Sequence, residues 1–201
     1  MTDDSANPQP SPYTIRLATT QADRDAAFRL RYEVFTAELG DDRYADHEKR
    51  LFLDCDDDAR NHLLIAELDD GTVIGTVRLT LLKDCRFIGY DAYGWDQLAT
   101  VLGITLDALL PRVARLDRGA VAKPWRRTGI LGAFQPSYFS ICYREGCDTL
   151  VGTIEVHNDG MRKAMASFGW SESGTIETFN GLTAQVIYRQ LPSTTTGHCG
   201  Q

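Results

Sequence analysis

The chain has 201 residues, 43% hydrophobic and 24% charged, which is the composition of a single folded domain rather than of a disordered or fibrous chain. Its formal net charge of −7 argues against a general nucleic-acid-binding protein, because such proteins normally carry a basic face. No run approaches the ~20 apolar residues that span a membrane, and the polar, acidic N-terminus lacks a signal-peptide pattern, so we expect a cytoplasmic protein with no membrane span.

One domain is predicted over residues 13–191, with no internal repeat and no low-complexity linker. Residues 1–12 and 192–201 are polar and offer few apolar side chains for packing, so they predict a disordered leader and a disordered tail. The five cysteines and four histidines do not combine at zinc-ligand spacing, and an odd number of cysteines favours reduced thiols. We therefore predict no metal site.

Strand and helix patterns alternate through this domain. Thr20 and Asp23 form a capping box at the start of the first helix, which Gly40 ends. Residues 69–71 (DDG) predict a tight hairpin turn, and Pro136 predicts a kink or a position in the first turns of its helix. The predicted elements are strand 13–17, helix 20–39, strands 62–67 and 73–82, short helices 96–101 and 106–110, strand 113–121, helix 129–145, strand 149–156, helix 160–168, and strands 174–179 and 184–190. This order predicts one mixed sheet with helices on both faces.

The segment from Arg112 to Ala133 carries the most informative functional pattern. A predicted strand over residues 113–121 runs into a basic turn at residues 123–127 (KPWRR), and a helix starts at Gly129. The free backbone N–H groups of a first helical turn and the positive end of its dipole favour a phosphate, and Arg126 and Arg127 add full positive charge. We therefore predict a site for a phosphorylated ligand, with an exposed basic helix start as the alternative.

This turn and a second motif resemble the GNAT acyltransferase superfamily. Arg126–Leu131 (RRTGIL) is similar to the turn [Q/R]-x-x-G-x-[G/A] that holds the pyrophosphate of coenzyme A, with leucine at the last position. Asn158 and the pair Gly169-Trp170 resemble the asparagine after the fifth strand and the Tyr-x-x-x-Gly-Phe helix end, and Met165 stands in the tyrosine position. The resemblance implies an α+β, GNAT-like single domain with a mixed, mostly antiparallel sheet. It implies donor contacts from Val121, Ala122, Arg126, Arg127, Gly129, Ile130, Leu131 and Asn158, and oxyanion contacts from amides near Ala120–Ala122.

The N-terminal half resembles one branch of this superfamily, which comprises the acyl-homoserine-lactone (autoinducer) synthases, the N-acyl amino acid synthases and the ornithine-lipid acyltransferases. The similar segments are Arg31–Phe35 (RYEVF), Asp54–Asp57 with His62–Leu64, Gly75–Leu79 and Arg115–Arg118, where Arg115 replaces a glutamate. The resemblance implies transfer of an acyl group from acyl-CoA or acyl-carrier protein to the amine of a small acceptor such as an amino acid. An acidic carrier protein would suit the basic turn.

Acyl transfer to an amine requires a group that accepts the amine proton. Glu155 and His157 alternate onto one face of a predicted strand, so either is a candidate base, Asp117 is a third, and we favour Glu155. Arginines on half-buried elements need acidic partners. We therefore predict an acceptor-binding lattice, with a purely structural ion-pair network as the alternative; its residues are Arg31, Phe35, Asp54, Asp57, Arg78 and Arg118.

Three other functions stay open at this point. One is an acyl-homoserine-lactone synthase that uses S-adenosylmethionine, and another is a small-molecule acetyltransferase. A third, from a different class, is a non-catalytic sensor that binds acyl-CoA. Arg115 and Met165 favour this alternative, because they stand where the family pattern has catalytic residues.

Overall fold

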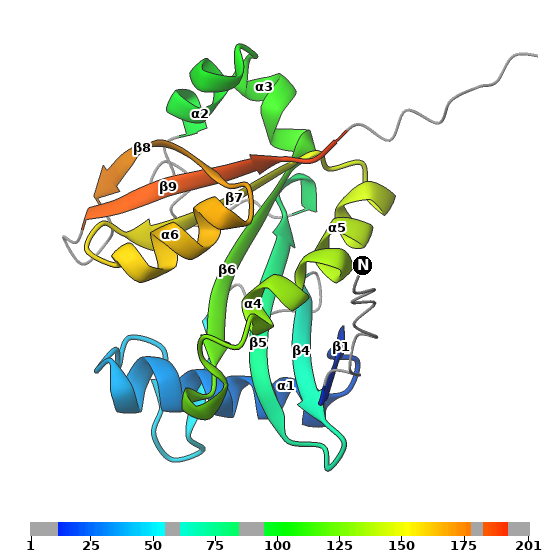
Figure 1. Cartoon of the computed structure of the whole chain (residues 1–201), viewed down its shortest axis with the longest axis vertical. Coiled ribbons are helices and arrows are strands. Elements are labelled where there is room, and N and C mark those ends of the chain that lie inside the picture. Colours follow the sequence, from blue (N-terminus) through cyan, green and yellow to red (C-terminus); the bar gives the residue numbers. More distant parts are fainter. Residues whose placement is uncertain (1–11, 55–60, 85–94, 178–182, 193–201) are drawn as a thin grey trace, which may run out of the picture.

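The computed structural model describes residues 12–54, 61–84, 95–177 and 183–192. A seven-stranded sheet of order β1-β4-β5-β6-β7-β9-β8 runs through the molecule (Figure 1). Its strands are β1 (Tyr13–Leu17), β4 (His62–Leu68), β5 (Val73–Leu81), β6 (Val113–Val121), β7 (Thr149–Glu155), β8 (Ser171–Glu177) and β9 (Thr183–Gln190). All neighbours are antiparallel except β6 and β7, so the predicted mixed, mostly antiparallel α+β sheet is confirmed.

The parallel contact between β6 and β7 is short. It joins Val113–Arg115 to Thr149–Val151 and ends there, although both strands continue. Figure 1 shows β7, β9 and β8 turning away from β4, β5 and β6 beyond this point. The sheet thus forms a first arm (β1, β4, β5, β6) and a second arm (β7, β9, β8) that meet at one closed end.

Helices cover both faces of the sheet, as predicted. On one face, called the α1 face, lie α1 (Gln21–Arg31), the π-helix η1 (Tyr32–Glu38), and the small sheet of β2 (Ala45–Asp46) and β3 (Leu51–Phe52). On the other, the α5 face, lie α4 (Ile130–Ala133), α5 (Gln135–Arg144) and α6 (Asp159–Ser167). The remaining elements are α2 (Trp95–Leu102), α3 (Leu106–Leu109) and the short 3₁₀ turns Leu82–Asp84, Leu110–Arg112 and Lys123–Trp125.

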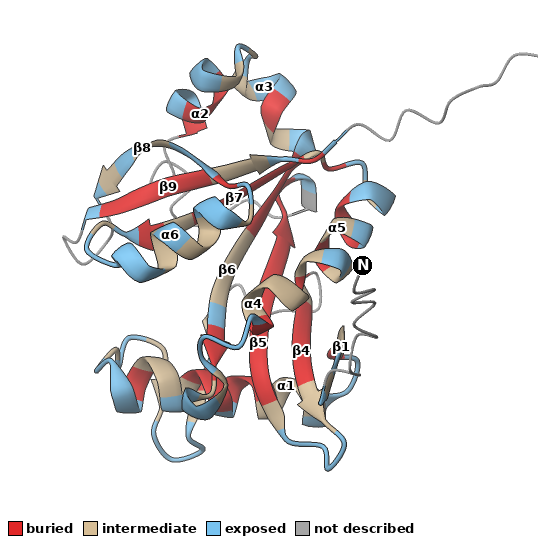
Figure 2. Cartoon of the chain, in the orientation of Figure 1, coloured by how far each residue is buried: buried red, intermediate tan, exposed pale blue. Residues whose placement is uncertain are grey.

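Alternation along β4 builds two separate cores. Leu63 and Ile65 pack against Ala27 and Phe28 of α1. The intervening residues Leu64 and Ala66 belong to the larger cluster on the α5 face, which includes Phe134, Tyr138 and Ile141. Figure 2 shows the resulting buried stripe along the middle of the sheet. Because successive strand side chains point to opposite faces, this run of apolar residues supports a layer on each side.

Two predicted helices differ from the structure. The capping box at Thr20 is present, but α-helical geometry ends at Arg31 and a π-helix carries the chain to Glu38. The predicted helix over 129–145 is interrupted at Phe134, so that α4 and α5 are separate and Pro136 lies in the first turn of α5. Proline has no N–H group and is tolerated in a first turn, where that group would lack a partner anyway.

The other predicted strands and helices lie within about three residues of their observed bounds. The hairpin turn at residues 69–71 is present, with Gly71 at φ 84°. The predicted leader and tail fall almost entirely on residues 1–11 and 193–201, which lie outside the described residues. Within the part of the chain that the structure describes, no helix is long and apolar enough to cross a membrane.

Candidate active site

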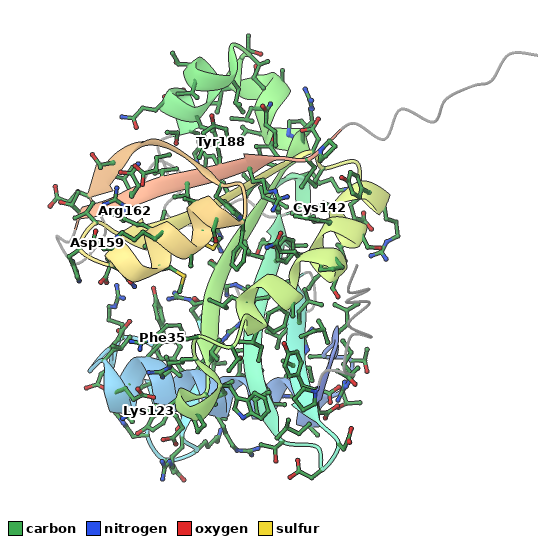
Figure 3. All side chains as sticks on the ribbon, in the orientation of Figure 1. Phe35, Lys123, Cys142, Asp159, Arg162 and Tyr188 are labelled. Carbon is green, nitrogen blue, oxygen red and sulfur yellow. The ribbon has the colours of Figure 1, made fainter. Side chains whose placement is uncertain are left out.

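A cavity of about 960 Å³ occupies the opening between the two arms. The first arm contributes β5, β6, η1 and the loop from Leu39 to Tyr44, and the second arm contributes β7, β9 and α6. Figure 3 shows Phe35 on the first arm, with Asp159 and Arg162 on the second arm beyond the opening. A volume of this size is in the range of ligand-binding sites, which is ~300–1,000 Å³.

The cavity has two chemically different walls because it passes through the sheet. The α5-face wall is apolar, and its members are Leu116, Leu131, Phe134, Tyr138, Ile154, Met161, Met165, Phe168, Trp170 and Ile187. The α1-face wall is charged, and its members are Asp41, Asp42, Arg43, Asp54, Arg78, Arg115, Asp117 and Arg118. The gap between the diverging strands joins the two walls.

Three arginines and two aspartates form an ion-pair lattice on the charged wall. Arg78 is 1% exposed and donates to both carboxylate oxygens of Asp117, at 2.8 and 2.9 Å, and to Asp54 at 2.5 Å. Arg118 pairs with the second oxygen of Asp54, and Arg115 pairs with Asp117 at 2.9 Å. The predicted pairing of Arg78 and Arg118 with Asp54 is present.

The lattice keeps its carboxylates ionised. Burial by itself raises the pKa of Asp54 and of Asp117, but the guanidinium of Arg78 and its neighbours outweigh burial and hold both pKa values below the ordinary value for aspartate. A proton on Asp117 would break its pairs with Arg78 and Arg115. The geometry therefore favours Glu155 over Asp117 as the proton acceptor.

A β-bulge places Arg118 at the cavity. Thr76 pairs with Ala120 and Arg78 pairs with Asp117, so β6 has one extra residue at Arg118–Gly119. Arg118 adopts φ 52°, in the left-handed region that non-glycine residues rarely occupy. Its guanidinium lies 4.9 Å from the ring centre of Tyr44. Bulges re-aim side chains, and this one directs Arg118 at the carboxylate of Asp54 and at an aromatic ring.

The other predicted acceptor-binding residues differ in whether they line the cavity. Phe35 lines the cavity from η1 and packs against Phe52, with ring centres 5.0 Å apart. Arg31 is fully buried on α1, 5.3 Å from the ring centre of Phe28, and does not line the cavity. Asp57 lies outside the described residues.

Glu155 and His157 lie together at the mouth of the cavity. The Nε2 atom of His157 is 3.0 Å from Oε2 of Glu155, and both side chains are about half exposed or more. Glu155 lines the cavity, whereas His157 is not among the described lining residues. Arg43, on the opposite arm, has a raised pKa because of its pair with Asp41, and the charge of Glu155 adds to that shift. Glu155 therefore faces the charged wall across the opening.

The basic turn is occupied by a carboxylate from η1. The guanidinium of Arg126 donates to both oxygens of Glu38, at 2.7 and 2.8 Å, and its Nε donates to the carbonyl of Val121 at 3.0 Å. Gly129 has φ 84° and precedes the first turn of α4, while Arg127 has φ 67°. The left-handed backbone at these two positions turns the chain sharply between β6 and α4.

Of the other residues predicted to bind the acyl donor, some line the cavity and others lie in the core. Leu131 and Asn158 line the cavity, and Asn158 also caps α6 by accepting the Met161 N–H at 3.1 Å. Ile130 is 2% exposed and anchors α4 to the core. The Ala122 N–H donates to the carbonyl of Ile74 at 2.9 Å, so it is not free to contact an oxyanion.

The sequence matches the family model of the acetyltransferase (GNAT) domain over residues 30–134. The chain belongs to the GNAT acetyltransferase family. No curated protein sequence matches it.

Solved structures share the fold of this chain. A GCN5-related N-acetyltransferase from Kribbella flavida is 20% identical with a TM-score of 0.62, covering 91% of this chain and 100% of its own. The protein yncA from Salmonella typhimurium, solved with its cofactor acetyl-CoA, is 17% identical with a TM-score of 0.60, covering 94% of this chain and 99% of its own. The CoA-dependent acyl-homoserine lactone synthase BjaI, solved with SAM and isopentyl-CoA, is 18% identical with a TM-score of 0.64. The match covers 84% of this chain and 76% of BjaI.

The ion-pair lattice predicts a large effect of removing one charge. We expect Asp54→Asn to lower the free energy of unfolding by about 3 kcal/mol at pH 7, because it breaks a buried ion pair and leaves Arg78 and Arg118 without this carboxylate. Urea denaturation measures the change. The folded pKa of Asp54 is lowered, so its stabilisation is complete above about pH 4 and is lost as the pH falls through the folded value.

The matched control for this prediction is Asp42→Asn. Asp42 also lines the cavity, but its side chain is 65% exposed, so its charge remains solvated. We expect a change of less than 1 kcal/mol there. Equal effects of the two substitutions, or a difference between wild type and Asp54→Asn that grows as the pH falls below 4, would contradict the role given to the lattice.

Proposed function

We propose that this protein is an N-acyltransferase that moves an acyl group from acyl-CoA or acyl-carrier protein to the amine of a small acceptor such as an amino acid. The observation that carries this proposal is a cavity that has both an apolar wall on the α5 face and a charged wall on the α1 face. A thioester donor enters along the apolar wall, the acceptor enters along the charged wall, and they meet in the gap between β6 and β7. Holding both reactants in line lowers the barrier to reaction.

The donor side of the proposal rests on the turn between β6 and α4. Arg126, Arg127 and the backbone N–H groups that follow Gly129 bind the phosphates of the donor. The edge of β6 beyond Arg115 has no pairing with β7, so it offers backbone partners to the amides of the pantetheine arm. The remaining donor contacts in this proposal are Val121, Ala122, Ile130, Leu131 and Asn158.

A carrier-protein donor would dock at the same turn. Lys123 begins the basic segment there, and an acidic carrier protein would be attracted to it. Acyl-CoA and acyl-carrier protein are both cytoplasmic donors, so the proposal includes a cytoplasmic location.

The acceptor side rests on the charged wall. Asp54 and Asp117 hold Arg78 in place, and the same Asp54 holds Arg118 beside the ring of Tyr44. We assign Arg118 to the carboxylate of the acceptor, because a guanidinium recognises a carboxylate with paired hydrogen bonds. The apolar part of the acceptor then packs on Phe35 and Tyr44.

Glu155 is the proposed general base. It faces the charged wall, where the acceptor amine would lie, and it accepts the amine proton directly or through water. His157 contacts its Oε2 atom and can pass the proton to solvent. The amine nitrogen attacks the thioester carbonyl, and we place the resulting oxyanion at backbone N–H groups of the bulge in β6.

The direct test is a product assay. The purified protein is incubated with acetyl-CoA, octanoyl-CoA or octanoyl-carrier protein and a pool of amino acids, with and without S-adenosylmethionine. We expect thiol release and a new N-acyl amino acid by mass spectrometry. A lactone that forms only with S-adenosylmethionine supports the autoinducer synthase, and acetyl transfer alone supports the acetyltransferase. Donor binding without thiol release supports a sensor and contradicts the enzyme.

The role of Glu155 predicts the effect of one substitution. We expect Glu155→Gln to lower kcat by about 10²-fold at neutral pH, because the amide cannot accept the proton. The loss shrinks as the pH rises and more of the acceptor amine is already neutral. Glu177→Gln on β8, outside the cavity, is the control. Unchanged turnover of Glu155→Gln at every pH would remove this residue from the mechanism.

The contact between Glu38 and Arg126 predicts competition with the donor. Arg126→Ala should weaken CoA binding about tenfold, in the range of charge-assisted hydrogen bonds. Glu38→Gln should strengthen CoA binding, because the phosphates no longer displace a carboxylate. Isothermal titration with CoA measures both effects. Pantetheine, which has no phosphates, is the control ligand, and equal changes for the two ligands would contradict the assignment of Arg126.

A further inference from the structure

The proposed reaction leaves a thiolate that must receive a proton on the donor side of the cavity. Among the described lining residues there is no histidine, cysteine or lysine, and the arginines do not release protons. Carboxylic acids with ordinary pKa values are ionised at neutral pH. The described lining residues include two tyrosines, Tyr44 and Tyr138, and a phenol hydroxyl can donate a proton.

We propose that Tyr138 on α5 donates the proton to the leaving thiolate and is a catalytic residue. This inference rests on the proposed function. Tyr138 lies on the apolar wall, with Met165 and Trp170. Tyr44 lies on the charged wall beside Arg118, on the side of the acceptor. A donor that enters along the apolar wall brings its sulfur to Tyr138 rather than to Tyr44.

The position of Tyr138 is firmly held by packing. The residue is 2% exposed, and the ring contacts Phe139 edge to face with ring centres 4.9 Å apart. Phe134, one turn before it, is 1% exposed, and Ile141 is 4% exposed, so α5 is pinned to the sheet on both sides of Tyr138. A fixed side chain that touches a reaction cavity is pre-organised for proton transfer.

The two central strands lie close together beside this position, at Gly152 of β7. A Cβ atom on Gly152 would lie 3.1 Å from the backbone oxygen of Leu116, where the two central strands begin to diverge. Gly152, Leu116 and Tyr138 all line the cavity. Glycine at this position therefore lets β7 and β6 approach closely at the closed end of the opening, on the wall that carries Tyr138.

The protonation states suit this role. Burial raises the pKa of Tyr138 well above its usual value, against smaller opposing effects of Arg189 and the Trp170 side chain, so the hydroxyl keeps its proton. The same burial raises the pKa of the Cys142 thiol, one turn further along α5, to about 12. A donor thiolate that forms in these surroundings is likewise more basic than in water. Burial disfavours the charged tyrosinate as well, so the phenol gives up its proton only as the C–S bond breaks and negative charge develops on sulfur.

The atoms and charges balance through the cycle. The acceptor nitrogen bonds to the carbonyl carbon, and the carbonyl electron pair moves to oxygen. When the intermediate collapses, the C–S bond breaks and its electrons stay on sulfur, which takes the proton of the Tyr138 hydroxyl and leaves as a thiol. The proton that Glu155 accepted from the amine returns to the tyrosinate through solvent. The products are an amide and a free thiol, and the protein is unchanged.

The test varies the leaving group. Octanoyl thioesters of N-acetylcysteamine and of 4-nitrothiophenol carry the same acyl group, but the second releases a much more acidic thiol that needs no proton. We expect Tyr138→Phe to lower kcat by about 10²-fold with the N-acetylcysteamine donor, the usual size of general-acid catalysis, and to leave the 4-nitrothiophenol rate nearly unchanged. Octanoyl-CoA binding, measured by titration, should stay the same.

Tyr143→Phe is the matched control, because Tyr143 lies on the same helix with 38% exposure and does not line the cavity. Thermal unfolding checks that Tyr138→Phe is folded. Equal losses with both donors would show a structural role and overturn the proposal, as would an unchanged rate with N-acetylcysteamine. Absence of thiol release by the wild-type protein with these donors and with octanoyl-CoA contradicts the proposed function itself, which is a separate outcome.

Discussion

The short parallel contact between β6 and β7 is the constraint on which the rest of this structure depends. Hydrogen bonds join the strands over three residue pairs, from Val113–Arg115 to Thr149–Val151, and the strands then diverge. The divergence creates a cavity that crosses the sheet, so that a single site has an apolar wall and a charged wall. It also leaves one edge of β6 without a neighbouring strand, which is where we place the donor.

The ion-pair lattice makes the charged wall possible. Arg78 is almost fully buried in the middle of a sheet, which is costly for an isolated guanidinium. Asp54 and Asp117 offset that cost and also hold Arg115 and Arg118. The structural and functional interpretations of these residues are therefore compatible, because the buried pairs position the partly exposed Arg118.

Sequence patterns predicted most of the fold because local periodicity records which side chains are buried. The capping box at Thr20 and the strand at residues 113–121 are present where they were expected. The π-helix at Tyr32–Glu38 and the break at Phe134 were not expected, because apolar spacing alone does not separate α from π geometry or one helix from two. The bulge at Arg118–Gly119 depends on the register with β5 and has no local signal.

By itself, the sequence determined the order of the elements, the basic turn after β6 and the need of Arg78 for acidic partners, since each follows from local pattern or from the cost of burying charge. Tertiary structure alone decided which distant groups meet. Glu38 reaches Arg126 from 88 residues away, and Tyr138 shares a cavity with Glu155 although they lie on different faces of the sheet. The physical reason is that these contacts arise from strand divergence and long-range packing, which no short segment encodes.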